Sequence, residues 1–240
     1  MVRPVPAIIL GVAALAARGR AEPLPTHVTP WAPTGGVVEP GRVRLEYGLV
    51  AHVSAAAGVA PGLELRVAAG APIAPLQLFA AEVALRGQLV RAGPLRVTVG
   101  AQAAAAWLDG ATGRRHGGEL TVGLHGPRGH VAWSRRRYLG GAAPVEVDVA
   151  TASIDLGPVR AAAAVGWVPA PSTGCPRAPR ARGDLRCLAT TAPAPAHALA
   201  LGVQFHGGRV TGSAGLALVL RRELPPVPLP YLVVSVPLRP

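Results

Sequence analysis

The stretch RVRLEYGLVAHV, Arg42 to Val53, decides the fold of this chain because its apolar and polar residues alternate. Successive side chains of a strand point to opposite faces, so a period of two predicts a β-strand with one apolar and one polar face. The pattern indicates one continuous strand that turns back through SAAAGVAPG (54–62), with Leu49 opposite Val67. The expected apolar face is Val43, Leu45, Tyr47, Leu49 and Ala51, and the expected polar face is Arg44, Glu46 and His52.

The same alternation recurs to the C-terminus, between clusters of Gly and Pro, and predicts an all-β chain. Connections after Val53, Leu89, His125, Leu156 and His206 are short, whereas those at 109–118, 139–144, 169–195 and 222–230 are longer. Alternating short and long connections, with strands of about nine to eleven residues, are typical of transmembrane barrels. We therefore expect an antiparallel up-and-down transmembrane β-barrel of about 12 strands (10–12), with eleven strands from Arg42 onward and a twelfth from Thr26–Val38.

Four hairpins can be assigned a register by requiring that like faces pair. Around HGPRGH (125–130), Val122 meets Trp133 and Glu119 meets Arg136. Around IDLGPVRA (154–161), Ile154 meets Ala161, and the alternation of the preceding stretch changes phase near Thr151, which predicts a bulge. The expected pairs in the other two hairpins are Leu85 with Val99 and, across a Gly207-Gly208 turn, Phe205 with Val210.

In a barrel surrounded by lipid, the polar face lines the lumen. Glu146 and Asp148 fall on this polar face in the expected strand phase. The residues expected to face the lumen are Arg44, Glu46, His52, Glu64, Arg66, Glu82, Arg86, Arg96, Gln102, Glu119, Arg160 and Gln204.

Aromatic residues are few and occur near the ends of expected strands, where membrane barrels carry interfacial girdles. Packing of the same side chains in the core of a β-sandwich is the alternative. The expected girdle residues are Phe79, Trp107, Trp167, Phe205 and Tyr231.

The N-terminus has the pattern of an export signal. Arg3 precedes an apolar run from Ala7 to Ala17, and Gly19 and Ala21 place small residues at a cleavage site. This predicts a signal peptide at residues 1–21, a single β-barrel domain at 22–240 and localisation in the outer membrane. No later segment reaches the roughly 18 apolar residues that a membrane helix needs.

Two cysteines, Cys175 and Cys187, lie in a Pro- and Arg-rich stretch. In an exported chain an even number of cysteines favours a disulfide, with two free thiols as the alternative. The net charge of +12 comes from dispersed arginines without a basic helix or an aromatic-interleaved motif, so nucleic acid is not an expected partner.

Motifs for phosphate loops, HExxH, CxxC and GxSxG are absent from the sequence. His125 and His130 could share a metal across a hairpin, but no third ligand is identifiable. His130 and Ser134, with Glu119 on the neighbouring strand, leave open a hydrolase, and Arg182-Gly183-Asp184 spells an adhesion tripeptide. We expect no catalytic residue, no cofactor and no metal site.

Three segments carry a resemblance to a known group of proteins: APTGGVVEPGRVRLEYGL (32–49), VAPGLELRVAAGAPI (59–73) and PPVPLPYLVVSVPL (225–238). They combine an early Pro-Thr stretch, a Gly before the first long strand and a Pro-rich approach to the last strand. In these features the chain resembles a family of uncharacterised, porin-like bacterial outer-membrane β-barrel proteins. The resemblance implies an outer-membrane barrel and carries no established activity; a departure is the ending VPLRP, where such barrels end in an aromatic residue.

The expected function is that of an outer-membrane β-barrel, structural or porin-like with a small pore, without catalytic activity. Its expected partners are the lipid bilayer and small polar solutes. Two alternatives are a soluble exported β-barrel or sandwich that binds an apolar ligand, and an outer-membrane hydrolase.

Overall fold

A computed structural model of the chain describes residues 27–29, 32–48, 52–70, 81–108, 111–140, 144–157, 159–168, 196–207, 210–221 and 224–237. The proposed signal peptide, Cys175 and Cys187, Phe79 and the Arg182-Gly183-Asp184 tripeptide lie outside these residues. Within them, no helix is long and apolar enough to cross a membrane.

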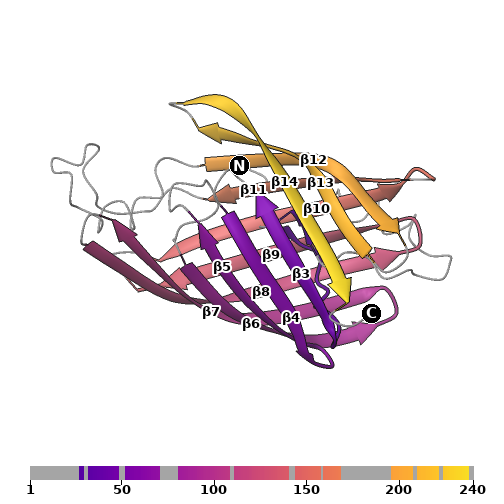
Figure 1. The fold of residues 1–240 in the computed structure, drawn as a ribbon, viewed down its shortest axis with the longest axis horizontal. Helices are drawn as coiled ribbons and strands as arrows, with labels where there is room; N and C mark the ends of the chain where they lie inside the picture. Colours follow the sequence, from indigo (N-terminus) through magenta and orange to yellow (C-terminus); the bar gives the residue numbers. More distant parts are fainter. Residues whose placement is uncertain are drawn as a thin grey trace, which may run out of the picture.

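Twelve antiparallel strands close into one barrel, which confirms the predicted fold class (Figure 1). Each strand pairs with its neighbours in sequence, and β14 returns to lie beside β3, so the sheet has no free edge. The strands are β3 (Arg42–Gly48), β4 (His52–Ala60), β5 (Leu63–Gly70), β6 (Ala81–Ala92), β7 (Leu95–Leu108), β8 (Ala111–Gly126), β9 (Gly129–Leu139), β10 (Val145–Asp155), β11 (Arg160–Val168), β12 (Ala196–Gly207), β13 (Val210–Arg221) and β14 (Leu224–Pro237).

The connections differ between the two ends of the barrel. At one end, which we call the short-turn end, the strands are joined by residues 61–62, 93–94, 127–128, 156–159 and 208–209. The other end carries the longest connections, 71–80 and 169–195, beside shorter ones. Two predicted loops are wrong in extent: β8 already begins at Ala111 and β14 at Leu224, so most of 109–118 and 222–230 belongs to strands.

The opening stretch is two strands and not one. β3 ends at Gly48, β4 begins at His52, and Tyr47 pairs with Val53. Val67 therefore lies opposite Ala55, and the predicted Leu49–Val67 pairing is wrong. This additional turn supplies the twelfth strand that the sequence pattern had assigned to Thr26–Val38.

The N-terminal segment takes no part in the barrel wall. β1 (His27–Thr29) and β2 (Ala32–Pro33) form a separate two-stranded sheet. This small sheet contacts β9, β10, β11, β13 and β14, and Ala32 and Thr34 are completely buried. The prediction of a wall strand at Thr26–Val38 is therefore wrong.

Two of the four predicted hairpin registers are confirmed. Val122–Trp133, Glu119–Arg136 and Ile154–Ala161 pair as predicted. Two other hairpins are displaced by two residues: Leu85 pairs with Ala101, and Phe205 with Gly212 across a turn at 208–209. A shift of two leaves every side chain on its expected face, because the strand period is two.

β10 departs from the expected phase. It pairs with β9 and β11 without a register shift, so the predicted bulge near Thr151 is absent from this strand. Val147 and Val149 are buried, whereas Glu146 pairs with the exposed Arg137. The valines of β10 thus face inward, and Glu146 and Asp148 belong to the outward-facing set together with Arg135 and Arg137.

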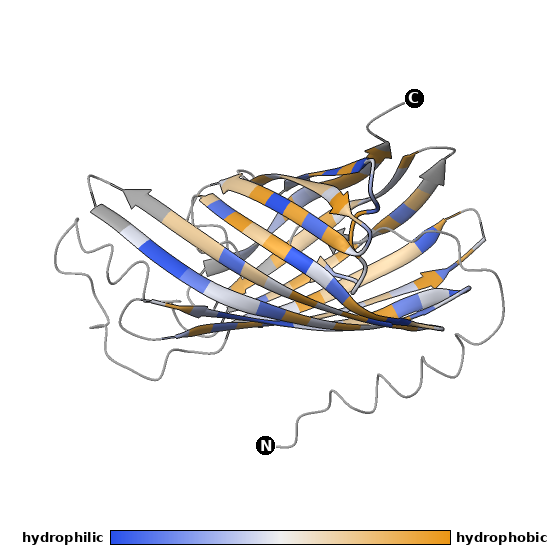
Figure 2. Ribbon diagram, turned by 90° about the horizontal axis from the view of Figure 1, so that it is seen from below, coloured by the Kyte–Doolittle hydropathy of each residue, from blue (hydrophilic) through white to orange (hydrophobic). Residues whose placement is uncertain are grey.

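The barrel wall exposes apolar side chains and buries polar ones, which is the reverse of a soluble protein. Large apolar side chains such as Leu45 and Tyr47 are about half exposed, at 50% and 51%, while their neighbours Arg44 and Glu46 are buried at 0% and 1%. Figure 2 shows polar and apolar residues alternating along single strands. Because the twelve strands close into one barrel, the fold is not a β-sandwich, in which two sheets pack face to face over an apolar core.

Candidate functional site

The barrel interior is the candidate site, and its most distinct feature is a network of buried ion pairs. Arg44 on β3 donates to Glu46 at 2.7 Å and holds Glu64 on β5 through two hydrogen bonds of 3.0 Å. Arg66 bridges Glu46 at 3.3 Å and Glu82 on β6 at 2.9 Å. The hydroxyl of Ser54 also donates to Glu46, so each of these carboxylates has several partners.

The network continues around the wall to β9. Arg86 on β6 contacts Glu64 at 3.3 Å and Glu119 on β8 at 2.9 Å. Arg136 on β9 donates to Glu119 at 2.5 Å, and the hydroxyl of Tyr138 donates to Glu82 at 2.9 Å. The four arginines and four glutamates of this set, which we call the ion-pair network, are Arg44, Arg66, Arg86, Arg136, Glu46, Glu64, Glu82 and Glu119.

Most residues proposed from the sequence to face the lumen are buried in the closed barrel. Glu82 keeps 13% of its side chain exposed, and Arg96 and Arg160 are partly buried near the short-turn end, where they donate to the carbonyls of Gly93 and Pro127. His52 begins β4, and its side chain is outside the described set. The fully buried members are Arg44, Glu46, Glu64, Arg66, Arg86, Gln102, Glu119 and Gln204.

The other half of the interior, on β10 to β14, is largely apolar. Its buried side chains form one cluster that includes Ala32 of β2. Tyr231 belongs to this cluster and is 3% exposed. Its hydroxyl oxygen lies against Gly202 and Gly215, and a Cβ atom on either glycine would collide with it. Its prediction as an interfacial girdle residue is therefore wrong. Two wall residues of the cluster, Ala104 on β7 and Tyr138 on β9, come from the β3–β9 half. Its wall residues on β10 to β14 are Val145, Val147, Val149, Ala162, Ala164, Ala198, Ala200, Ala217 and Tyr231.

Residues 32–38, which we call the inner segment, run between these two halves and bond to the polar one. The backbone N–H of Val38 donates to Glu64 at 2.9 Å, which links the inner segment to the ion-pair network. The hydroxyl of Thr98 donates to the carbonyl of Gly35 at 2.6 Å, and His125 Nε2 lies 2.6 Å from the carbonyl of Thr34. The inner segment is thus held mainly through its own backbone, by side chains of the wall.

Two glycines of the wall make room for this part of the chain. A Cβ atom on Gly123 of β8 would collide with the carbonyl oxygen of Thr34. A Cβ atom on Gly58 of β4 would collide with the carbonyl oxygen of Glu39, directly after the inner segment. Because even an alanine would be too large at either position, the wall is shaped to the path of the N-terminal chain.

The residues considered for a hydrolase do not assemble. His130 pairs with His125, as predicted, and their rings stack with centroids 5.5 Å apart. His130 Nδ1 lies 2.6 Å from the hydroxyl of Ser153 on β10, while the carboxylate of Glu119 is held by Arg86 and Arg136. Ser134 therefore has neither a base nor a supporting carboxylate.

Metal binding finds no support in the described part of the chain. No group of three or more His, Cys, Asp or Glu side chains converges there, and His125 is already occupied by the carbonyl of Thr34. Two histidines alone fall short of the three protein ligands that catalytic zinc sites use.

Three interior residues were missed as site candidates by the sequence reasoning. Arg136 and Tyr138 complete the ion-pair network, and Arg115 on β8 is buried at 3%. Arg136 carried a usable signal, because it was expected opposite Glu119 across a clear turn. The inner segment carried no signal for an interior position, because nothing in its sequence shows that it contacts residues of the wall far away in the chain.

No family model matches the chain, and no curated protein matches it. Among solved structures, the NanC porin aligns with a TM-score of 0.52 and 10% sequence identity, over 82% of this chain and 98% of that chain. An anion-selective porin from Comamonas acidovorans aligns with a TM-score of 0.42 and 12% identity, over 77% of this chain and 57% of that chain. At these identities the likeness to the NanC porin concerns the fold alone, which is a closed antiparallel porin-type barrel.

Proposed function

We propose that this protein is an outer-membrane β-barrel with a small, porin-like pore and no catalytic activity, whose interior is closed by its own inner segment. The observation that carries the proposal is the inverted distribution of side chains: an apolar exterior surrounds a buried network of ion pairs. A lipid bilayer is the solvent that suits such an exterior, and closure of the sheet satisfies the backbone of every strand. The resemblance to porin-like outer-membrane proteins points to the same membrane.

Small polar solutes are the proposed cargo. The β3–β9 half of the interior offers charged groups of both signs, whereas the β10–β14 half is largely apolar and contacts the small β1–β2 sheet. A path for solutes therefore runs along the ion-pair network and opens when the inner segment moves away from it. Hydrogen bonds to Glu64, Gln88, Thr98 and His125 join that segment to the polar wall. Displacing the segment breaks these local contacts and leaves the pairing of the wall strands intact.

Membrane location is tested by fractionating cells that express the full chain. We expect the protein in the membrane fraction, with extraction only by detergent. Recovery of folded protein in the soluble fraction without detergent would contradict the proposal and favour the soluble apolar-ligand carrier.

The pore is tested by single-channel recording in planar bilayers with Gly123→Ala. The new methyl group collides with the carbonyl of Thr34, so the inner segment must leave its position and conductance should rise severalfold above that of the wild type. Gly87→Ala on β6 is the matched control, because its Cβ would have no neighbour closer than 3.9 Å, and its conductance should equal that of the wild type. If none of the three proteins conducts ions, the pore proposal is wrong and the barrel is purely structural.

A further inference from the structure

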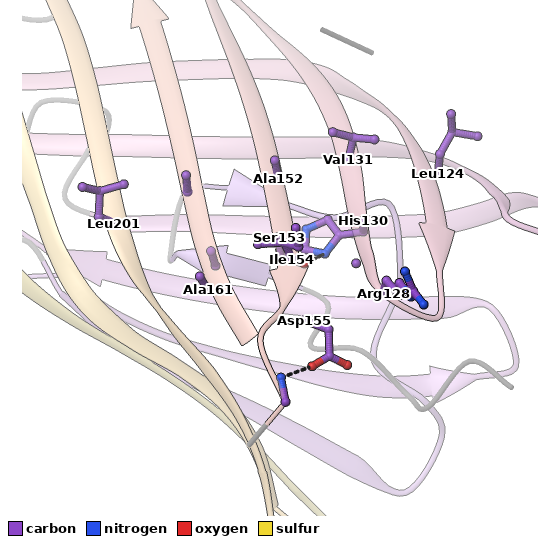
Figure 3. Close-up of a pocket in the computed structure, with 14 residues that line it drawn as sticks. Leu124, Arg128, His130, Val131, Ala152, Ser153, Ile154, Asp155, Ala161 and Leu201 are labelled. Atoms are coloured by element: carbon purple, nitrogen blue, oxygen red, sulfur yellow. Dashed lines mark hydrogen bonds between the residues drawn. The ribbon is translucent and has the colours of Figure 1, made fainter. Parts of the chain in front are cut away.

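A cavity of about 630 Å³ lies on the barrel at the short-turn end, across β8 to β12 (Figure 3). Its floor is made of small outward-facing residues, since Ala163 on β11 pairs with Ala152 on β10 and with Leu201 on β12. Larger apolar side chains stand on either side. Figure 3 shows Leu124 and Val131 at one flank and Leu201 at the other, projecting from neighbouring strands.

The shape of this groove follows from the sequence of the strands that form it. Ala152, Ala161 and Ala163 are outward-facing positions at which other strands of this wall carry Leu or Val, so three missing side chains leave a depression. The volume lies within the range of pockets that hold small-molecule ligands. Because the lining is predominantly apolar, the ligand that fits must bring an extended apolar part.

One cation stands at the end of the groove. Arg128 lies in the turn between β8 and β9, is exposed and lines the cavity. The nearby carboxylate of Asp155 is engaged by the backbone N–H of Gly157 at 2.9 Å and by Arg160 at 3.7 Å. No hydrogen bond or ion pair of the Arg128 side chain occurs within the described residues, so its guanidinium is available to an anionic ligand.

We propose that this groove is a binding site for one phospholipid, with an acyl chain along the alanines and the phosphate on Arg128. The inference rests on the proposed membrane location and not on the pore. An apolar groove that ends at an unengaged arginine at the short-turn end matches a molecule with a hydrocarbon tail and an anionic head. In outer-membrane barrels the short turns are periplasmic, so the lipid comes from the periplasmic leaflet. Guanidinium groups suit phosphate because they offer two parallel donors.

The test uses the purified full chain in detergent micelles, titrated with dioleoylphosphatidylglycerol or with dioleoylglycerol, which lacks the phosphate, and followed by native mass spectrometry. We expect one phosphatidylglycerol to bind about tenfold more tightly than diacylglycerol, as a charge-assisted contact implies. Arg128→Gln should abolish this preference. Arg91→Gln, an exposed arginine at the same end of the barrel but outside the groove, should preserve it.

The apolar half of the site is tested by Ala163→Phe, which fills the groove with a side chain compatible with lipid. Binding of both lipids should fall at least tenfold, whereas Ala103→Phe, on the exposed face of β7, should leave it unchanged. Equal lipid binding by both variants would overturn the site while leaving the membrane location intact. If the wild type binds neither lipid and needs no detergent, the membrane location itself fails. A dimer that persists in Ala103→Phe and is lost in Ala163→Phe would show that a second copy of the chain occupies the groove. That result would overturn the proposed lipid site.

Discussion

At the scale of the residue, Glu64 is the position on which the most interior contacts depend. Its carboxylate accepts from Arg44, Arg86 and the backbone of Val38, and it is completely buried. Removing one partner of a buried ion pair leaves an uncompensated charge, which costs several kcal/mol. The carboxylate thus holds three parts of the molecule together: β3, β6 and the inner segment.

Glu64→Gln should therefore lower the free energy of unfolding by about 3–5 kcal/mol. Equilibrium urea unfolding in micelles, followed by tryptophan fluorescence, measures this loss. Glu146→Gln is the control, because its pair with Arg137 at 3.6 Å is on the exterior and partly exposed, and pairs of this kind contribute less than about 1 kcal/mol. Equal losses for the two variants would show that the network contributes no more than a surface ion pair.

At the scale of the element, the outward face of each wall strand must be apolar if lipid surrounds the barrel. Leu216 in the middle of β13 is 54% exposed, and Leu89 near the short-turn end of β6 is 66% exposed. Exposure alone therefore does not distinguish these two positions, whereas depth in a bilayer does. An arginine costs about 2–4 kcal/mol at the midplane of the bilayer and about 0–1 kcal/mol near its interface.

We expect Leu216→Arg to destabilise the barrel in phosphatidylcholine vesicles by about 2–4 kcal/mol and Leu89→Arg by less than about 1 kcal/mol. Unfolding by guanidinium in vesicles measures both. A small and equal loss in the free energy of unfolding at the two positions would mean that water surrounds the strands. That result would favour a soluble barrel.

At the scale of the whole molecule, the balance of charge inside the barrel determines which solutes pass. Among the described residues, five arginines are buried, Arg44, Arg66, Arg86, Arg115 and Arg136, against the carboxylates of Glu46, Glu64 and Glu119 and the partly exposed Glu82. Arg96 and Arg160 add positive charge near the short-turn end. An interior with excess positive charge attracts anions.

The open pore of Gly123→Ala should therefore prefer chloride over potassium. In a tenfold KCl gradient across the bilayer, the reversal potential should have the same sign as the equilibrium potential of chloride. Adding Arg115→Glu to this variant should weaken the preference for chloride, since it lowers the interior charge by two units. A cation preference in Gly123→Ala alone would show that solutes follow a path away from these arginines.

The sequence by itself determined the strand period and, in most strands, which residues share a face. These properties are local, because alternation assigns each residue to a face whatever its partner is. Thus Arg44 and Glu46 are buried whereas Leu45 and Tyr47 are about half exposed, and Glu119 pairs with Arg136 across the β8–β9 turn. Registers displaced by two residues kept the same faces, so the pattern could not distinguish them.

Only the tertiary structure decided what fills the barrel. The connection between β3 and β4 follows Gly48 inside a stretch that otherwise keeps its alternation, so it was read as one strand. Residues 32–38 were read as part of a wall strand although they lie inside. The valines of β10 were expected to face outward, yet they face inward against an apolar cluster that includes Ala32. An apolar side chain is equally well buried against lipid or against a segment in the lumen, and the choice depends on contacts between residues far apart in the sequence.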